Sequence, residues 1–277
     1  MSDAAAGPLI DAHAHFLHEH AGRADWQRVN DARFRAGRTM GITYHVASVL
    51  GSYGHTSPTY FPSPEDVSRG NLAMLRIATE NADTVRWYVT VNPNHTAHAV
   101  AEIQRGASAG AIGVKLLASR RADDPLLDPI CREAGERGLP VLHHIWQHRT
   151  RAWPNQDISD GLDLAALAAR HPRTSFVLAH LGGGGDWAHT LPAVADSPNI
   201  FPDLSGSGVD RGMIDQAVAT LGAKRLLWAC DLTMETGLAK LRALEAAGLS
   251  TEDISDIRWR NATRIFASPA FPRCAAA

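Results

Sequence analysis

The chain has 277 residues, of which 45% are hydrophobic, and its 27 basic and 29 acidic side chains leave a net charge of −2. This balance provides no sustained positive field, which argues against a nucleic-acid binder. No apolar run is long enough to span a membrane, and the N-terminus lacks the basic and apolar segments of a secretory signal. The three cysteines are too few and too widely spaced for a disulfide framework. We therefore expect a cytoplasmic protein with no nucleic-acid or membrane partner.

Strand-like apolar runs recur along the chain, and each is followed by a helix-like stretch. The runs begin near Leu9, Ile42, Val85, Ala111, Leu139, Ser175, Ile200 and Leu226. Their starts are 25 to 43 residues apart, and one β/α unit needs about 30 residues. Eight such units predict an α/β fold, a (β/α)8 TIM barrel, as a single domain over residues 1–277 with its core at 8–267. An open doubly wound sheet is the alternative.

Helix boundaries can also be predicted from local signals. Ser63-Pro-Glu-Asp66 and Ser250-Thr-Glu-Asp253 have the capping residue and the acid that begin a helix. Glycines stand where predicted helices give way to strands, which is typical of a left-handed helix stop; these are Gly41, Gly110, Gly138 and Gly222.

Chemically capable side chains occur where the predicted strands end. His13 and His15 close the first strand, and residues two apart in a strand face the same side. The other strand-end groups are Lys115, His143, His144, His180 and Asp231. Catalytic groups of a barrel lie at the carboxyl ends of its strands, and paired imidazoles suit a metal ion. An isolated His-x-His motif is weak evidence and is more often a pair of solvated or core histidines, but the recurrence of such groups at several strand ends predicts a site.

Five motifs together resemble a known family. They are Ile10-Asp-Ala-His13-Ala-His15, a histidine after Pro140-Val-Leu-x, Val177-Leu-Ala-His180-Leu-Gly-Gly, Asp231 at the end of an apolar run, and Arg260-Asn-Ala-Thr-Arg264-Ile-Phe. The set resembles the amidohydrolase superfamily. More narrowly, it is similar to the amidohydrolase-2 or metal-dependent hydrolase branch, which also holds the aminocarboxymuconate-semialdehyde decarboxylase group. The resemblance spans residues 8 to 267.

The resemblance implies a role for each matched residue. His13, His15, His144 and Asp231 would bind one divalent metal ion. Asp231 would also take a proton from water, and His180 would shuttle a proton or polarise the substrate. Zn²⁺ suits this donor set, Mn²⁺ and Fe²⁺ are alternatives, and no organic cofactor is expected. His143 would point into the barrel wall.

Two positions depart from the family pattern. Lys115 is followed by Leu116-Leu-Ala-Ser, where relatives often have a histidine and a proline. This departure favours a substrate-anchoring or structural lysine over a carboxylated lysine that bridges two metals. Cys230 precedes Asp231, where relatives usually have threonine or serine. A thiol there could be a soft ligand, although a buried cysteine is more often an apolar filler.

Further substrate contacts are expected from the loops after strands four and five. Arg120 follows the fourth strand, and Trp146 and Arg149 belong to a long loop after the fifth. We interpret that loop as a lid with an aromatic wall and a carboxylate clamp; a solvated loop is the alternative.

We expect a metal-dependent hydrolase that uses activated water to attack a carbonyl of a small, carboxylated lactone or amide. The alternative is a metal-dependent non-oxidative decarboxylase of the same superfamily, and the third interpretation is a catalytically silent ligand-binding barrel. The partner is then a small-molecule substrate, together with a second copy of the chain if it forms a homodimer.

Overall fold

The computed structural model describes residues 7–20, 23–49, 57–145, 152–153, 156–183, 187–210, 212–231, 234–266 and 271. Two predicted substrate contacts, Trp146 and Arg149, lie outside the described residues. Among the residues that are described, no helix has the length and apolar character needed to cross a bilayer.

Seven parallel strands form one curled sheet whose order follows the chain, β1-β2-β3-β4-β5-β8-β9. Their bounds are Ile10–Phe16, Tyr44–Val49, Val85–Val91, Gly113–Leu116, Val141–His144, Phe176–Ala179 and Ile200–Pro202. The numbering skips a two-stranded antiparallel hairpin, β6 (Ala152–Trp153) and β7 (Gln156–Asp157), which follows β5.

Residues 226–231 close the sheet into a barrel. On one side Leu227 N donates to Pro202 O of β9 at 3.0 Å. On the other side, Ala12 N of β1 donates to Trp228 O at 3.1 Å, and Asp231 N donates to His13 O at 2.7 Å. This segment is the eighth strand position, so the predicted (β/α)8 barrel is confirmed.

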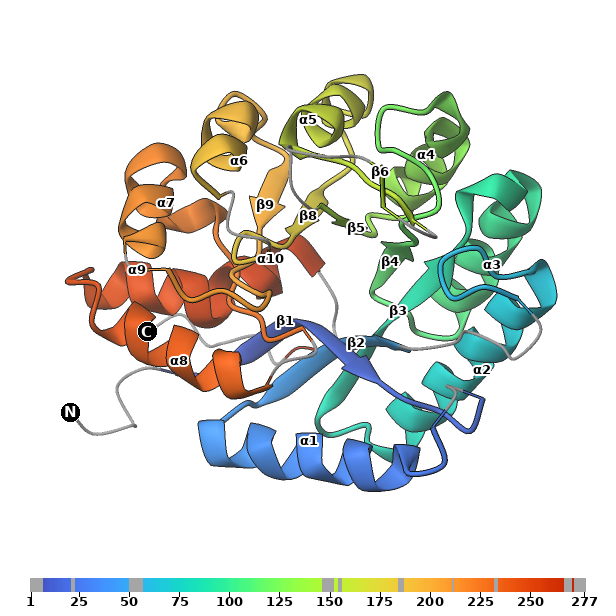
Figure 1. Cartoon of the computed structure of the whole chain (residues 1–277), viewed down its shortest axis with the longest axis horizontal. Helices are drawn as coiled ribbons and strands as arrows, with labels where there is room; N and C mark the ends of the chain where they lie inside the picture. Colours follow the sequence, from blue (N-terminus) through green and yellow to red (C-terminus); the bar gives the residue numbers. More distant parts are fainter. Residues whose placement is uncertain are drawn as a thin grey trace.

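Helices surround the strands in chain order (Figure 1). The ring consists of α1 (Trp26–Met40), α2 (Pro64–Glu80), α3 (Thr96–Ser108), α4 (Asp128–Glu136), α5 (Gly161–Arg170), α6 (Trp187–Val194), α7 (Met213–Leu221) and α8 (Met234–Glu245). Short elements complete the chain: 3₁₀ turns η2 (Pro93–His95), η3 (Pro125–Leu127) and η4 (Ala223–Arg225), α9 (Thr251–Ser255), the π-turn η5 (Asp256–Arg260) and α10 (Asn261–Phe266).

Most of the predicted helix boundaries are confirmed. Ser63 caps α2 by accepting a hydrogen bond from Asp66 N, and Ser250 caps α9 in the same way. Gly41 ends α1 in the left-handed conformation, with φ of 77°. Gly222 also has positive φ, but its ψ of 148° is extended, so this stop is not the expected left-handed cap. It leads directly into η4 rather than into a strand.

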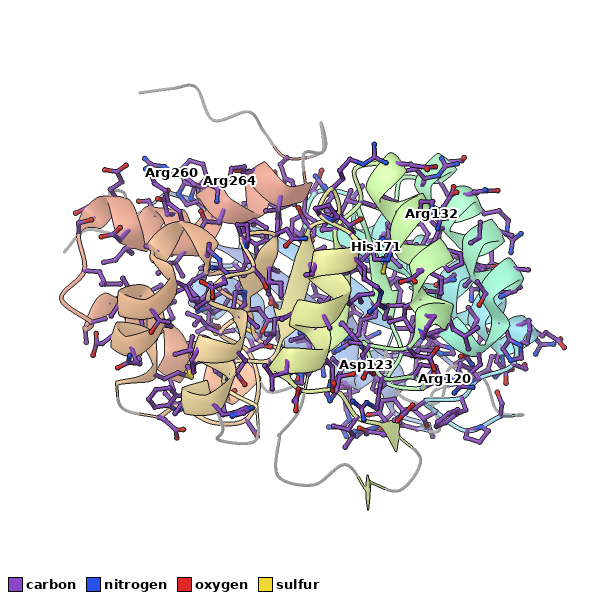
Figure 2. All side chains as sticks on the ribbon, turned by 90° about the horizontal axis from the view of Figure 1, so that it is seen from above. Arg120, Asp123, Arg132, His171, Arg260 and Arg264 are labelled. Atoms are coloured by element: carbon purple, nitrogen blue, oxygen red, sulfur yellow. The ribbon has the colours of Figure 1, made fainter. Side chains whose placement is uncertain are left out.

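The interior of the barrel is apolar at one end. A buried cluster there combines side chains of the strands with α10, which lies behind the barrel centre in Figure 1; its members include Ile10, Ala12, Tyr88, Leu142, Val177, Leu227 and Phe266. Figure 2 shows Arg260 and Arg264 at this end and Arg120 and Asp123, which follow β4, at the opposite end. Polar side chains that point into the barrel can therefore gather only at the carboxyl ends of the strands.

Candidate metal centre at the carboxyl ends of the strands

A β-bulge in β1 directs two histidines into the barrel. Ile10 and Ala12 pack in the interior cluster, so simple alternation would turn the odd-numbered residues outward. The pairing with β2 instead slips by one residue between Asp11 and Ala14, which reverses the alternation. His13 and His15 then face inward, both buried, with their Nε2 atoms 3.0 Å apart.

Asp231 joins these imidazoles from the closing segment. Its φ is 60°, in the left-handed region that non-glycine residues seldom adopt. Its Oδ1 lies 3.2 Å from His15 Nε2 and 3.7 Å from His13 Nε2. Its Oδ2 lies 3.0 Å from Nε2 of His180, which follows β8. One carboxylate thus contacts three imidazoles that come from two strands.

His144 lies at the edge of this group. Its ring packs edge-on against that of His180, with centroids 4.6 Å apart. The ligand atoms of His13, His180 and Asp231 all lie within 4.8 Å of one another, and this set includes neither His144 nor His15. The structure therefore brings His144 against His180, at the predicted site. Its neighbour His143 is fully buried, with Nε2 3.2 Å from Ser159 Oγ.

Lys115 of β4 brings a positive charge into the cluster. Its side chain is buried, and Nζ lies 3.3 Å from His13 Nε2. Burial lowers the pKa of this ammonium to about 8, although the charges of Asp231 and Asp203 oppose the shift. Lys115 therefore remains largely protonated at neutral pH.

The donor atoms of the cluster fit a divalent cation. Two nitrogens at right angles around an ion, each bonded at about 2.1 Å, would lie about 3.0 Å apart, which is the separation of His13 Nε2 and His15 Nε2. Burial, with the charge of Lys115, lowers the pKa of His13 to about 3, and burial also lowers the pKa of His15. Both shifts favour the neutral imidazole, which is the form that binds a metal ion.

The carboxylate of the cluster is also in the form that a metal binds. Burial alone would raise the pKa of Asp231, but its interactions with His180, His13 and His15 outweigh burial and hold the pKa well below its usual range. Neutral nitrogens with an ionised oxygen suit Zn²⁺, Mn²⁺ and Fe²⁺ alike. The donor set thus favours a divalent ion without selecting the element.

Supporting polar groups, which sequence reasoning missed, surround the histidines. Asp203, directly after β9, places Oδ2 3.0 Å from His13 Nδ1. Ser48 at the end of β2 places Oγ 3.0 Å from His15 Nδ1. Asp11 accepts a hydrogen bond from Cys230 N at 2.9 Å and pairs with His45 at 3.1 Å. Asp203 follows an apolar strand just as Asp231 does, so the same strand-end rule could have found it.

Two further residues singled out in the sequence are Arg120 and Cys230. Arg120 donates from Nε to Asn94 Oδ1, and its side chain is 40% exposed at the rim. Asp124 lies 3.5 Å from the Arg120 guanidinium, so this side chain is held by neighbours of the same rim. Cys230 is fully buried directly before Asp231, and burial raises the pKa of its thiol well above the usual value.

Comparison with known proteins gives a family and a set of similar folds. The family model described as Amidohydrolase matches residues 10–267. A search of curated proteins finds no match to the chain.

Three similar solved structures illustrate the shared fold. The 2,6-dihydroxybenzoate decarboxylase from Rhizobium has a TM-score of 0.70 and 16% identity, over 94% of this chain and 98% of that one. The dihydroxybenzoic acid decarboxylase from Polaromonas sp. JS666, with bound manganese and 2-nitroresorcinol, has a TM-score of 0.70 and 16% identity, over 94% of this chain and 97% of that one. The 5-carboxyvanillate decarboxylase from Novosphingobium aromaticivorans, with manganese and a nitrobenzoic acid, has a TM-score of 0.71 and 17% identity, over 96% of this chain and 98% of that one.

Proposed function

Because this chain belongs to the amidohydrolase family, we propose that it is a divalent-metal-dependent enzyme that removes a carboxylate, as carbon dioxide, from a small hydroxylated aromatic acid. The observation that carries the proposal is the buried cluster of His13, His15, His180 and Asp231 at the barrel mouth, with Lys115 beside it. The sequence favoured hydrolysis over decarboxylation. The decarboxylases among the similar structures, which carry manganese in two of the cases above, support the second reaction.

The charges of the cluster suit an anionic substrate. Asp231 and Asp203 are negative and Lys115 is positive, so a divalent ion would make the immediate cluster net positive. A carboxylate substrate would be attracted to such a mouth. The Lys115 ammonium, buried at the end of β4, can hold a substrate oxygen there.

Decarboxylation breaks one carbon–carbon bond and leaves the electron pair on the ring carbon. Carbon dioxide departs, and a proton must take its place on that carbon. His180 Nε2 and Asp231 Oδ2, 3.0 Å apart, can hold and deliver this proton. A bound divalent ion would stabilise the negative charge that builds up on substrate oxygens. Lys115 adds to the same stabilisation because it lies in the low-dielectric interior.

Hydrolysis of a lactone or amide is the second candidate, because the same carboxylate–imidazole pair can accept a proton from water and return it to a leaving group. The two reactions differ in their products. Decarboxylation releases carbon dioxide, whereas hydrolysis of a lactone or amide releases none and generates a new acid.

The test combines metal analysis with product detection. Purified protein is stripped with a chelator, reloaded with Mn²⁺ or Zn²⁺, and incubated with carboxyl-¹³C-labelled 2,6-dihydroxybenzoate and 5-carboxyvanillate. We expect labelled carbon dioxide only from the reloaded protein. Asp231→Asn should lower the rate by about 10²–10⁴-fold. The matched control is His171→Gln, which removes an imidazole that is hydrogen-bonded to Asp128 and does not belong to the cluster. In Figure 2, His171 lies nearer to Arg132 than to Arg120 and Asp123.

Three outcomes would separate the interpretations. Metal-dependent carbon dioxide release that Asp231→Asn abolishes supports the decarboxylase. Acid production from lactones or amides without carbon dioxide supports the hydrolase. A protein that takes up less than about 0.3 equivalents of transition metal and turns over neither substrate class would be a ligand-binding barrel.

A further inference from the structure

We propose that Asp203 is a positioning residue that locks the His13 imidazole in one tautomer, so that its Nε2 lone pair points into the metal cluster. Asp203 lies at the carboxyl end of β9, far from β1 in the chain, yet its Oδ2 is 3.0 Å from His13 Nδ1. The inference rests on the proposed metal site but not on the reaction that the site performs.

The contacts of Asp203 leave one oxygen for the imidazole. Its side chain is fully buried. Oδ1 accepts hydrogen bonds from Ser205 N, at 2.9 Å, and from Ser205 Oγ. Oδ2 faces His13 Nδ1. An ionised carboxylate can only accept hydrogen bonds, so Nδ1 must be the protonated nitrogen of His13.

Asp203 is itself fixed by the barrel. Its backbone N donates to Leu178 O at 2.9 Å, and its O accepts from Leu181 N at 2.9 Å, so it is paired with the segment that leads to His180. Ser205 O accepts from Gly182 N at 2.9 Å. The carboxylate thus has little freedom to turn away from His13.

The hydrogen bonds of Asp203 agree with this assignment. Oδ1 accepts from both the backbone and the hydroxyl of Ser205, and Oδ2 lies 3.0 Å from His13 Nδ1. With the proton on Nδ1, the opposite nitrogen of His13 carries a lone pair, 3.0 Å from His15 Nε2.

The two histidines of β1 are supported unequally. His15 Nδ1 faces a neutral hydroxyl, Ser48 Oγ, at 3.0 Å, whereas His13 Nδ1 faces a carboxylate. A carboxylate on the far nitrogen fixes the ring and makes the metal-facing nitrogen more basic. A hydroxyl can donate or accept, so it does not select a tautomer by itself. His13 is thus the ligand whose orientation is set before the metal binds.

The experiment measures metal affinity rather than turnover. Metal-stripped wild type and Asp203→Asn are titrated with Co²⁺ against a chromophoric chelator. An asparagine can offer an N–H to His13 Nδ1 and so favour the other tautomer. We expect affinity about 10–100-fold weaker in Asp203→Asn. Ser205→Ala keeps the carboxylate but removes one of its donors, together with a hydroxyl that lies 3.3 Å from His13 Nδ1. We expect Ser205→Ala to weaken Co²⁺ affinity by less than Asp203→Asn.

The control is Glu102→Gln. Glu102 is also a buried carboxylate in a hydrogen-bond network, but it lies on α3 and contacts Ser68 and Asn71 of α2. It should change Co²⁺ affinity less than twofold, although it removes a comparable buried charge. A second readout is the ¹⁵N spectrum of histidine-labelled protein without metal, assigned through His13→Ala. Wild type should show Nδ1-protonated His13, and Asp203→Asn should not.

The outcomes distinguish this inference from the proposed reaction. If wild type binds Co²⁺ and Asp203→Asn weakens binding, the inference holds, whether or not carbon dioxide is released. If Asp203→Asn folds and binds as tightly as wild type, or if His13 is not protonated at Nδ1, the inference is wrong. If Asp203→Asn does not fold, Ser205→Ala and the wild-type spectrum decide. A wild type that binds no ion overturns the inference as well.

Discussion

Replacement of Gly206 by alanine should damage both the barrel and its candidate site. Gly206 has φ of +101°, a region that L side chains rarely adopt. A Cβ at this position would lie 2.4 Å from Gly183 N and 2.6 Å from Gly182 C. Both are backbone atoms, so the turn after His180 would have to move. The contact of His180 Nε2 with Asp231 Oδ2, now 3.0 Å, depends on that turn.

The size of the effect follows from two separate contributions. A non-glycine residue at such a φ costs about 1–3 kcal/mol of unfolding free energy. Forcing an extra carbon against packed atoms costs about 1–3 kcal/mol more. Gly110 provides the matched control because its φ of +90° is similar but a Cβ there would meet no atom within 4 Å. Gly110→Ala should therefore show only the first contribution.

Urea denaturation, extrapolated to zero denaturant, gives the unfolding free energy of both variants. We expect Gly206→Ala to lose about 1–3 kcal/mol more than Gly110→Ala and to bind Co²⁺ more weakly, whereas Gly110→Ala keeps wild-type affinity. Equal losses within about 0.5 kcal/mol, with unchanged metal affinity in both, would refute the argument that this close approach positions His180.

Three further perturbations test other parts of the structure. Mn²⁺ at 100 times its dissociation constant should raise the unfolding free energy by about 2.7 kcal/mol, and Asp231→Asn should remove this gain in a urea titration. Burial would raise the pKa of Glu102, but hydrogen bonds from Ser68, Arg105 and Asn71 hold it below its usual value. The ionised carboxylate therefore stabilises the fold at pH values above the ordinary glutamate pKa. The unfolding free energy of wild type should exceed that of Glu102→Gln there, and the excess should shrink as pH falls through that pKa and below it. An excess that stays constant between pH 3 and pH 6 would contradict this. Tyr88→Phe removes the hydroxyl that donates to Ala12 O at 2.6 Å, and should cost about 1–2 kcal/mol with no change in m-value; a loss under about 0.3 kcal/mol would show that this hydrogen bond contributes little.

The positions of the strands could be predicted closely because strands buried on both faces are short, apolar and rich in branched side chains. The strand predicted to begin at Val85 is β3, which begins at that residue. The strand predicted to begin near Ala111 is β4, which begins two residues later, at Gly113. The family resemblance is likewise confirmed by the match over residues 10–267. These features depend on local composition and spacing, which a single sequence displays directly.

The arrangement within β1 could not be predicted in the same way. Alternation correctly puts His13 and His15 on one side, but it gives no reason why they should share the interior with Ile10 and Ala12. That outcome depends on the bulge between Asp11 and Ala14. A bulge is set by pairing with the neighbouring strand, so its signal lies in the tertiary structure rather than in the local residue pattern.

The partners of the histidines were also beyond the sequence pattern. Asp203 is 190 positions from His13, and nothing local to either residue indicates the pairing. Closure of the barrel brings β9, residues 226–231 and β1 side by side, and only then do these strand ends meet. Trp146 and Arg149 lie outside the described residues, so the substrate contacts expected of them stay predictions.

The apolar floor of the barrel explains why its polar residues occur as supported sets. Tyr88, Leu142 and Val177 fill the interior beneath the cluster, and in such surroundings a polar group without a partner is costly. Each buried histidine of β1 therefore has its own supporting group, Ser48 for His15 and Asp203 for His13. These supports come from strand ends and not from the loops above them. The loops can then change the substrate that enters the mouth while the imidazoles keep their orientation, which is the division of labour that a barrel scaffold permits.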